Sequence, residues 1–369
     1  MSTITKPRIA LAQSAPLPPS SPSSPSSAPS TSSDPISHQL NYERALDFVR
    51  QAAKLGADLV CFPEYFISGV VAEKEHWHLA QAPHTHAHLH TDSHPSSTSA
   101  FTAEHWLSGF KKLAKELRVD IAVGTIVERA VDDRGEELWK EVEVESEETG
   151  EKRIEKRPVL ENVAHYVDWN GEVIGRYSKR NLWWPEKDYL TAGENDHQVF
   201  ETRFGRVGLL ICWDLASPLS LPSLLLHPSG PPDLIIAPTY WTLTDAGPAG
   251  LQHNPDSERE YVETLVKGRA WEGECAVVFV NAAAPASWLP HDPTGNEDGR
   301  FGSSQVCVPF KGRVGGAKGP QEELVIVDVD LSILTDARAA YGVSRDLQEK
   351  LSDPRRREVL PGWVRAAEK

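Results

Sequence analysis

Three side chains with reactive groups stand at the ends of short apolar runs in this sequence. Glu64, Lys179 and Cys212 each close, or closely follow, a run that is expected to form a strand. Open α/β sheets assemble their sites at the carboxyl ends of strands, so these three residues are expected to lie together. A thiol, a carboxylate and an ammonium supply a nucleophile, a proton acceptor and a group that stabilises an anion. Each also has an ordinary explanation, because a strand cysteine often fills a core and a lone Glu or Lys often forms an ion pair.

In this order, the segments around the three residues resemble those of the nitrilase, or carbon–nitrogen hydrolase, superfamily. The resemblance extends from about residue 8 to residue 331. It lies in FPEY around Glu64, YSKRNLWWPE around Lys179 and GRVGLLICWD around Cys212. Supporting matches are 233–238 (DLIIAP), 269–274 (RAWEGE) and 302–304 (GSS).

This resemblance implies a fold, a set of site residues and an assembly. The fold is a four-layer α-β-β-α sandwich of the α/β class. The implied catalytic residues are Glu64, Lys179 and Cys212, and the family's second glutamate matches Glu186. Family members form homodimers or larger homo-oligomers, so the same is expected here. Five residues are expected to bind the substrate or its oxyanion: Trp213, Asp214, Tyr65, Trp184 and Tyr240. Packing would equally explain the aromatic residues of the site loops.

The implied chemistry sets a requirement on two pKa values. Moving a proton from a reference cysteine (pKa about 8.5) to a reference glutamate (about 4.3) costs about 5.7 kcal/mol in water. The site must therefore lower the pKa of Cys212, raise that of Glu64, or do both; Lys179 favours the thiolate and burial opposes ionised Glu64. The thiolate attacks the substrate carbon, and Lys179 and the Trp213 N–H receive the oxyanion. Glu64 then protonates the leaving nitrogen and later activates water to cleave the thioester, so neither a metal nor a cofactor is needed.

The expected function is hydrolysis of a small amide or N-carbamoyl compound, with release of ammonia or an amine. Asp214 follows Cys212-Trp213, as in the amidase and N-carbamoyl hydrolase branches that the sequence resembles, whereas nitrile-hydrolysing members commonly carry Glu there. A nitrilase that converts a nitrile to the acid is the alternative within the family. A catalytically silent binding or scaffold protein and a histidine-rich metal protein are the alternatives from other classes.

Composition narrows the partners and the compartment. The 369 residues are 40% hydrophobic and 25% charged, which excludes a fibre or global disorder, and the net charge is −15. Such a surface disfavours nucleic acid and anionic membranes, so a small-molecule substrate is expected. The sequence shows neither an apolar run long enough for a membrane span nor a signal-peptide pattern at residues 1–6. The four cysteines are widely scattered, which favours a reducing, cytoplasmic location.

Three segments read as insertions into one hydrolase domain, expected at 6–335 and followed by a C-terminal extension, 336–369, with an expected role in oligomerisation. The first insertion, 14–37, is rich in Ser and Pro and is expected to be a flexible loop. The second, 76–98, holds seven of the 14 histidines, some at alternate positions. A metal site there is conceivable, but a solvated loop is the favoured interpretation. The third, 132–157, mixes Glu with Lys and Arg and is expected to form a solvated hairpin or loop.

The remaining sequence alternates between strand-like and helix-like patterns, which indicates an α/β layered domain with mixed sheets. Helices are predicted at 40–55, 106–117 and 257–272; the last begins where Ser257 and Glu260 have the spacing of a capping box. Asn170-Gly171 predicts a tight hairpin. The predicted strands are 8–13, 57–62, 121–127, 165–169, 172–177, 199–202, 206–212, 234–237, 276–281, 305–310 and 324–329.

Overall fold

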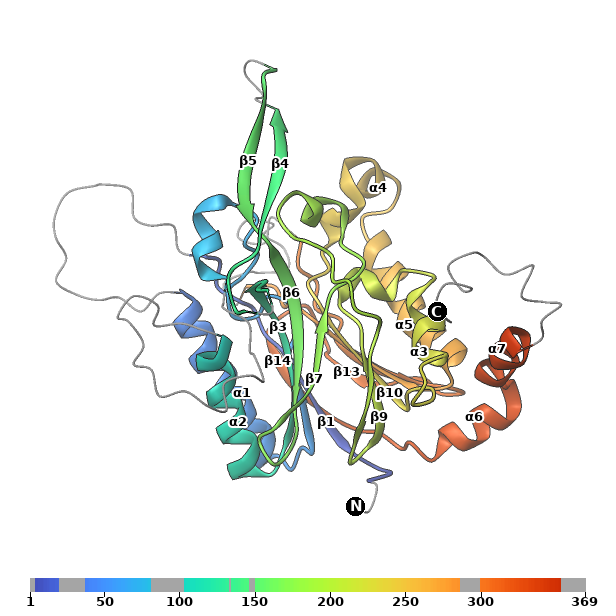
Figure 1. Ribbon diagram of the computed structural model, residues 1–369. Coiled ribbons are helices and arrows are strands. Elements are labelled where there is room, and N and C mark those ends of the chain that lie inside the picture. Colours follow the sequence, from blue (N-terminus) through green and yellow to red (C-terminus); the bar gives the residue numbers. More distant parts are fainter. Residues whose placement is uncertain are drawn as a thin grey trace.

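Two six-stranded sheets form the centre of the computed structural model of this chain (Figure 1). The described residues are 4–19, 37–80, 103–132, 134–145, 150–285 and 299–352. The strands of the first sheet, in spatial order, are β14 (Glu323–Asp328), β1 (Arg8–Gln13), β2 (Leu59–Cys61), β3 (Asp120–Arg129), β6 (Leu160–Val167) and β7 (Val173–Ser178).

Two helices cover the outer face of this first sheet. Because β1, β2 and β3 run parallel, the chain must cross over between them, and it does so through α1 (Ser37–Lys54) and α2 (Ala103–Leu117). The apolar stripes of both helices pack on the sheet in one cluster that includes Phe48 of α1, Phe110 of α2 and Ile121 of β3. The predicted hairpin forms between β6 and β7, where Gly171 has the positive φ of 85° that the turn requires.

The second sheet has the same plan. Its strands are β13 (Gly312–Gly316), β12 (Gln305–Val308), β11 (Ala276–Asn281), β10 (Leu234–Thr239), β9 (Gly205–Leu209) and β8 (Val199–Thr202). The three central strands run parallel, and α5 (Ser257–Gly273) packs on the outer face, with α3 (Ser220–Leu225) beside it.

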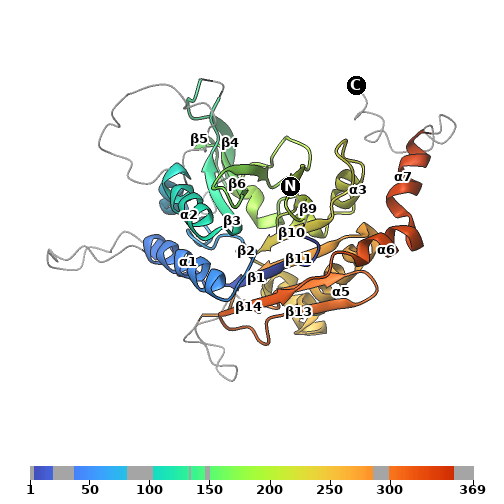
Figure 2. The same cartoon turned by 90° about the horizontal axis from the view of Figure 1, so that it is seen from below.

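The inner faces of the two sheets share one apolar core. Ile9 and Leu11 of β1 belong to the same buried cluster as Ile236 of β10 and Val278 of β11. Helices therefore lie outside each of two facing sheets, as the view from below shows (Figure 2). The α/β class expected from the sequence is confirmed. This packing brings the carboxyl ends of β2 and β10 together, since the Glu64 N–H donates to the Thr239 carbonyl at 3.3 Å.

Most predicted elements form within a few residues of their expected bounds, and the exceptions have physical reasons. The predicted strand 206–212 ends early, at Leu209, and Cys212 instead begins a short 3₁₀ helix, η3 (Cys212–Leu215). The capping box at Ser257 does not form, because Asp256 is the N-cap residue and makes no side-chain cap bond. Glycine-rich β13 escaped prediction, as did helices too short for a clear apolar period: α3, α4 (Gly247–His253), α6 (Ile333–Tyr341) and α7 (Val343–Ser352).

The three expected insertions have different outcomes. Residues 14–19 are described and packed, since Ala15 is 5% exposed and Leu17 exchanges hydrogen bonds with Asn41, so a flexible loop is wrong for this part. Residues 20–36 lie outside the described residues, as do 81–98 of the histidine-rich insertion. The third insertion forms a hairpin of β4 (Trp139–Glu145) and β5 (Lys152–Pro158), which projects from the body of the molecule (Figure 1).

Two findings bear on metals and membranes. Within the described ranges, no group of three or more His, Cys, Asp or Glu side chains is arranged to hold a metal ion. No helix in these ranges is both long and apolar enough to cross a bilayer.

Candidate active site

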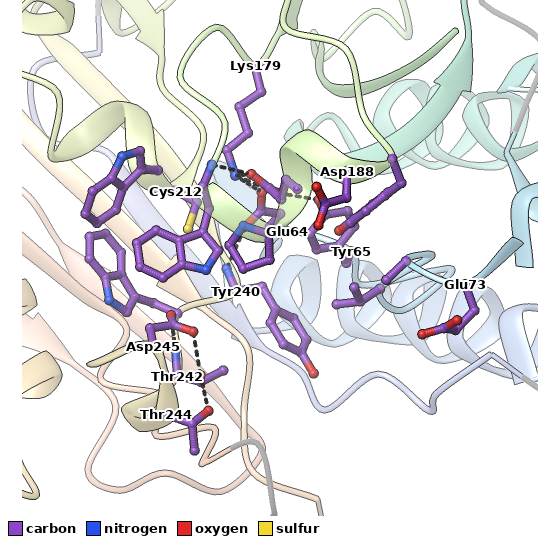
Figure 3. A pocket seen from close by; sticks show the side chains of 18 residues that line it. Glu64, Tyr65, Glu73, Lys179, Asp188, Cys212, Tyr240, Thr242, Thr244 and Asp245 are labelled. Atoms are coloured by element: carbon purple, nitrogen blue, oxygen red, sulfur yellow. Dashed lines mark hydrogen bonds and ion pairs between the residues drawn. The ribbon is translucent and has the colours of Figure 1, made fainter. Parts of the chain in front are cut away.

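A cavity of about 470 Å³ opens beside the carboxyl ends of β2, β7 and β9. Glu64, Lys179 and Cys212 all line it, each from a different one of these chain segments, so the structure brings the three predicted residues together. In Figure 3 their side chains converge, with Asp245 and Thr242 on one side and Glu73 at the far end. The cavity is large enough for a small organic substrate.

The Glu64 carboxylate is 1% exposed and is held by three donors. Oε1 accepts hydrogen bonds from Lys179 Nζ at 2.8 Å and from Asn162 Nδ2 at 2.7 Å, and Oε2 accepts one from the Tyr240 N–H at 2.8 Å. Burial raises the pKa of Glu64 to about 7, because desolvation outweighs the opposing effect of the Lys179 ammonium. A carboxylate with this pKa can both accept and return a proton near neutral pH.

Lys179 forms a buried bridge between two carboxylates. Its ammonium lies 2.8 Å from Oε1 of Glu64 and 2.7 Å from Oε2 of Glu186, and its side chain is 1% exposed. Burial alone would lower the pKa of Lys179, but Glu186 and Glu64 outweigh it and raise this pKa well above its usual range. The side chain is therefore a fixed cation. Its backbone is also held: its N–H donates to the Asn162 carbonyl at 2.9 Å, and its carbonyl accepts from the Gly193 N–H at 2.9 Å.

Glu186 sits in the 3₁₀ helix η2 (Trp184–Asp188) and lines the cavity. Its Oε1 accepts from Tyr65 Oη at 2.5 Å as well as from Lys179, and its Oε2 accepts from the Trp183 N–H at 2.8 Å. The second carboxylate is thus held by the Tyr65 hydroxyl and the Trp183 N–H, and it contacts the same ammonium that Glu64 contacts.

Cys212 stands apart from the other three cysteines. Cys61, Cys275 and Cys307 are fully buried in the core, as expected, whereas Cys212 is 7% exposed and lines the cavity. It adopts a left-handed backbone conformation with φ of 46°, which is strained for a residue other than glycine. Burial, followed by the Glu64 charge, raises the pKa of the Cys212 thiol well above its usual range, although Lys179 opposes this. Of the two changes that the sequence analysis allowed, the raised pKa of Glu64 is found, whereas the pKa of the Cys212 thiol is raised and not lowered.

The predicted substrate-binding residues divide into two groups. Tyr65, Tyr240 and Trp213 line the cavity as expected. Trp213 also lies in the first turn of η3, where backbone N–H groups lack intrahelical partners and can receive an oxyanion.

Two of the predicted residues lie elsewhere. Trp184 is 74% exposed and is not part of the lining, and the adjacent Trp183 lines the cavity in its place. Asp214 is fully buried, and its carboxylate accepts hydrogen bonds from neighbouring segments instead of lining the cavity. Neither residue is therefore placed to contact substrate.

Several functional candidates escaped the sequence analysis. Asn162 is fully buried and links Glu64 to the Lys179 backbone, and no sequence signal singles it out, because its strand also carries Glu161 and His165. Asp245 lines the cavity, where it accepts hydrogen bonds from the N–H and hydroxyl of Thr242 at 3.0 and 2.8 Å. Burial raises the pKa of Asp245 to about 6. No sequence pattern marks Asp245.

Comparison with known proteins extends these observations to a family. The family model described as carbon-nitrogen hydrolase matches residues 9–339. A probable nitrilase of Schizosaccharomyces pombe is 29% identical over 191 residues, which are 52% of this chain and 61% of that protein. An N-carbamoylputrescine amidase of Arabidopsis thaliana is 25% identical over 200 residues, or 52% of this chain and 63% of that protein. Each match thus spans a little over three fifths of the relative's length.

Among solved structures, a carbon-nitrogen hydrolase from Helicobacter pylori has a similar fold. The TM-score is 0.64 at 18% sequence identity, and the alignment covers 93% of this chain and 95% of that one. At this identity the likeness concerns the fold alone.

Proposed function

The chain belongs to the carbon–nitrogen hydrolase family, and on that basis we propose that it hydrolyses a small amide or N-carbamoyl compound through a thioester on Cys212. The observation that carries this proposal is the Lys179 ammonium between the Glu64 and Glu186 carboxylates, in the cavity that Cys212 lines. Lys179, Glu64 and Cys212 thus provide a buried cation, a base with a pKa near 7 and a nucleophile within one cavity.

The first half-reaction begins with a neutral thiol, because its pKa is raised. As the bond from Sγ to the substrate carbon forms, the Sγ proton passes to Glu64, and the carbonyl oxygen takes the negative charge. The Lys179 ammonium and the Trp213 N–H stabilise that oxygen, a contribution worth about 3 kcal/mol per donor. The tetrahedral intermediate then collapses: the carbon–nitrogen bond breaks, and the nitrogen takes the proton from Glu64 and leaves as ammonia or an amine.

The second half-reaction restores the enzyme. Water attacks the thioester carbon and gives a proton to Glu64, the carbon–sulfur bond breaks, and Sγ takes that proton back as the acid departs. Glu186 holds the Lys179 ammonium in place throughout, since it contacts Nζ with both oxygens.

The charges of the cavity indicate which substrates it accepts. Five carboxyl side chains line it, whereas Lys179 is the single basic side chain among the described lining residues and already contacts two of those carboxyls. An anionic acyl group would therefore be repelled, so the proposed substrate is neutral or carries an ammonium. The amidase relative from Arabidopsis thaliana is named for an N-carbamoyl amine, which belongs to this charge class.

Release of ammonia by the purified protein from matched amides, ureido compounds and nitriles with the same carbon skeleton tests the proposal. Hydrolysis of an amide or ureido compound, with kcat/KM above that of the matched nitrile, supports it. A nitrile with the higher kcat/KM that yields the acid makes the protein a nitrilase. Release from no compound, together with an unreactive Cys212, indicates a silent binding protein. The variant Cys212→Ala is the blank in each case.

The organisation expected from the sequence is part of the same proposal. It comprises a hydrolase domain over 6–335, an extension over 336–369 that contributes to assembly, a homodimer or larger homo-oligomer, and a cytoplasmic location. Light scattering of the full chain and of a chain ending at residue 335 tests the assembly.

A further inference from the structure

We propose that Asp214 is a positioning residue that sets the place of the Lys179 ammonium relative to the Cys212 thiol. The buried Asp214 carboxylate accepts hydrogen bonds both from the segment that carries Lys179 and from the turn that carries Cys212. The inference rests on the proposed function, because Lys179 and Cys212 are the groups it serves.

The Asp214 carboxylate is fully buried and accepts four hydrogen bonds. Oδ1 accepts from the N–H and the Nδ2 of Asn181 at 2.8 and 2.7 Å. Oδ2 accepts from Tyr177 Oη at 2.8 Å and from the Ile211 N–H at 3.0 Å. Tyr177 lies two residues before Lys179 and Asn181 two residues after it, so the carboxylate is hydrogen-bonded to the chain on both sides of that lysine.

The same carboxylate holds the turn that presents the nucleophile. Ile211 immediately precedes Cys212, whose φ of 46° is a strained conformation for a residue with a Cβ. Such a conformation persists only where the surroundings over-determine it. The bond from the Ile211 N–H to Asp214 closes the first turn of η3 and is one of the contacts that hold this conformation.

A carboxylate suits this role and an amide does not. Both carboxylate oxygens accept, and each faces two donors. An asparagine of the same size would turn an NH₂ group toward one pair of donors, so it would release either the Asn181 side or the Tyr177 and Ile211 side. A displacement of about 1 Å between reacting groups can cost about 100-fold in rate.

The variant Asp214→Asn tests this role through steady-state kinetics on an amide that the enzyme hydrolyses. We expect kcat to fall about 100-fold and KM to change less than about threefold, because Asp214 does not line the cavity. The acidic limb of the pH profile should also move, since the contact of Lys179 with Glu64 changes. Tyr177→Phe removes a single donor and should lower kcat about tenfold, and adding it to Asp214→Asn should lower kcat little further.

Asp233→Asn is the matched control. Asp233 accepts the Arg206 N–H at 2.8 Å, pairs with Arg338 at 2.8 Å and does not line the cavity. This variant should lower the melting temperature while leaving the kcat of the folded enzyme unchanged.

Three results would overturn the inference. The first is an Asp214→Asn enzyme that folds and keeps kcat within threefold of the wild type. The second is a rise in KM at constant kcat, which would mean substrate binding. The third, should Asp214→Asn fail to fold, is a Tyr177→Phe enzyme with unchanged kcat and pH profile. If the wild type hydrolyses no amide, the proposed function fails, and the role of Asp214 is then tested through the rate at which iodoacetamide alkylates Cys212. If this rate is the same in the wild type, in Asp214→Asn and in Tyr177→Phe, the inference is overturned independently of the proposed function.

Discussion

The Lys179 ammonium lies 2.8 Å from Oε1 of Glu64, yet burial keeps the pKa of that carboxyl at about 7. A nearby cation favours the ionised carboxylate, so the raised pKa shows that desolvation is the larger effect. A carboxyl group with this pKa is ionised above neutral pH and can still hold a proton, as the proposed mechanism requires of Glu64.

Cys212 should react before the other cysteines with small alkylating reagents. It is the cysteine that lines the cavity, whereas Cys61, Cys275 and Cys307 are fully buried in strands or beside them. Brief treatment with iodoacetamide, followed by peptide mass analysis, should find the label at Cys212 and a parallel loss of activity. Label at Cys61 or Cys307 in enzyme that stays active would contradict the assignment. Cys212→Ala should fold normally and be inert.

Activity should fall as the pH drops below about 7. The acceptor must be ionised Glu64, and the ionised fraction decreases about tenfold for each pH unit below its pKa of about 7. The acidic limb of a plot of log kcat/KM against pH should therefore have unit slope and a midpoint near 7. Glu64→Gln should lower kcat by at least about 100-fold. Glu143→Gln, on the exposed face of the β4–β5 hairpin, serves as the control and should leave the midpoint unchanged.

Replacing Lys179 with Met should reduce both stability and activity. The change leaves two carboxylates, Glu64 and Glu186, buried without their shared cation, and breaking a buried pair in this way costs about 3–5 kcal/mol. Urea unfolding should show this loss in the free energy of unfolding, and Lys152→Met on the exposed hairpin should show almost none. Adding Glu186→Gln should restore part of the stability but not the activity. Recovery of activity in the double variant would contradict the role given to Lys179.

Asp245 should govern the response to substrate charge. In a series of amides of equal length that end in methyl, ammonium or carboxylate, the carboxylate should have the lowest kcat/KM. Asp245→Asn should reduce the ratio of kcat/KM for the ammonium substrate to kcat/KM for the carboxylate substrate about tenfold, mainly through a change in KM. Because burial places the pKa of Asp245 at about 6, discrimination should be strong at pH 7.5 and weaken below 6. Equal discrimination by the wild type and Asp245→Asn would show that other groups set it.

The Ser/Pro-rich insertion should be dispensable over 20–36 but not over its whole length. A long loop adds little closure entropy, about 0.6 kcal/mol per doubling of length, so a short Gly-Ser linker for 20–36 should leave the melting temperature and turnover unchanged. Replacing 14–37 should destabilise the protein, because Ala15 is buried and Leu17 bonds to Asn41. Equal melting temperatures for the two replacements would contradict the packing of 14–19.

The sequence by itself determined the family, the α/β class and the three residues, Glu64, Lys179 and Cys212, that the structure brings together in one cavity. This information is local: Glu64, Lys179 and Cys212 each stand in a short motif, and each strand is marked by a run of apolar residues within a few positions. The hydrophobic effect favours burial of such apolar runs between packed layers, and this does not depend on which strands are neighbours in a sheet. Glycine-rich β13 (Gly312–Gly316) was not predicted, because it has neither an apolar run nor a regular apolar period in its sequence.

Tertiary structure alone decided what surrounds the reactive groups. Asn162 bonds to Glu64 across 98 positions of sequence, and this contact depends on the order of strands in the sheet. Trp183 and Trp184 are adjacent, yet one lines the cavity and the other is exposed, because the segment has no regular period to predict which side faces inward. Asp214 turns away from the cavity because its buried carboxylate accepts hydrogen bonds from four donors on two separate segments, and buried polar groups are hydrogen-bonded. Contacts of this kind arise only when distant parts of the chain pack together, and for that reason no local pattern records them.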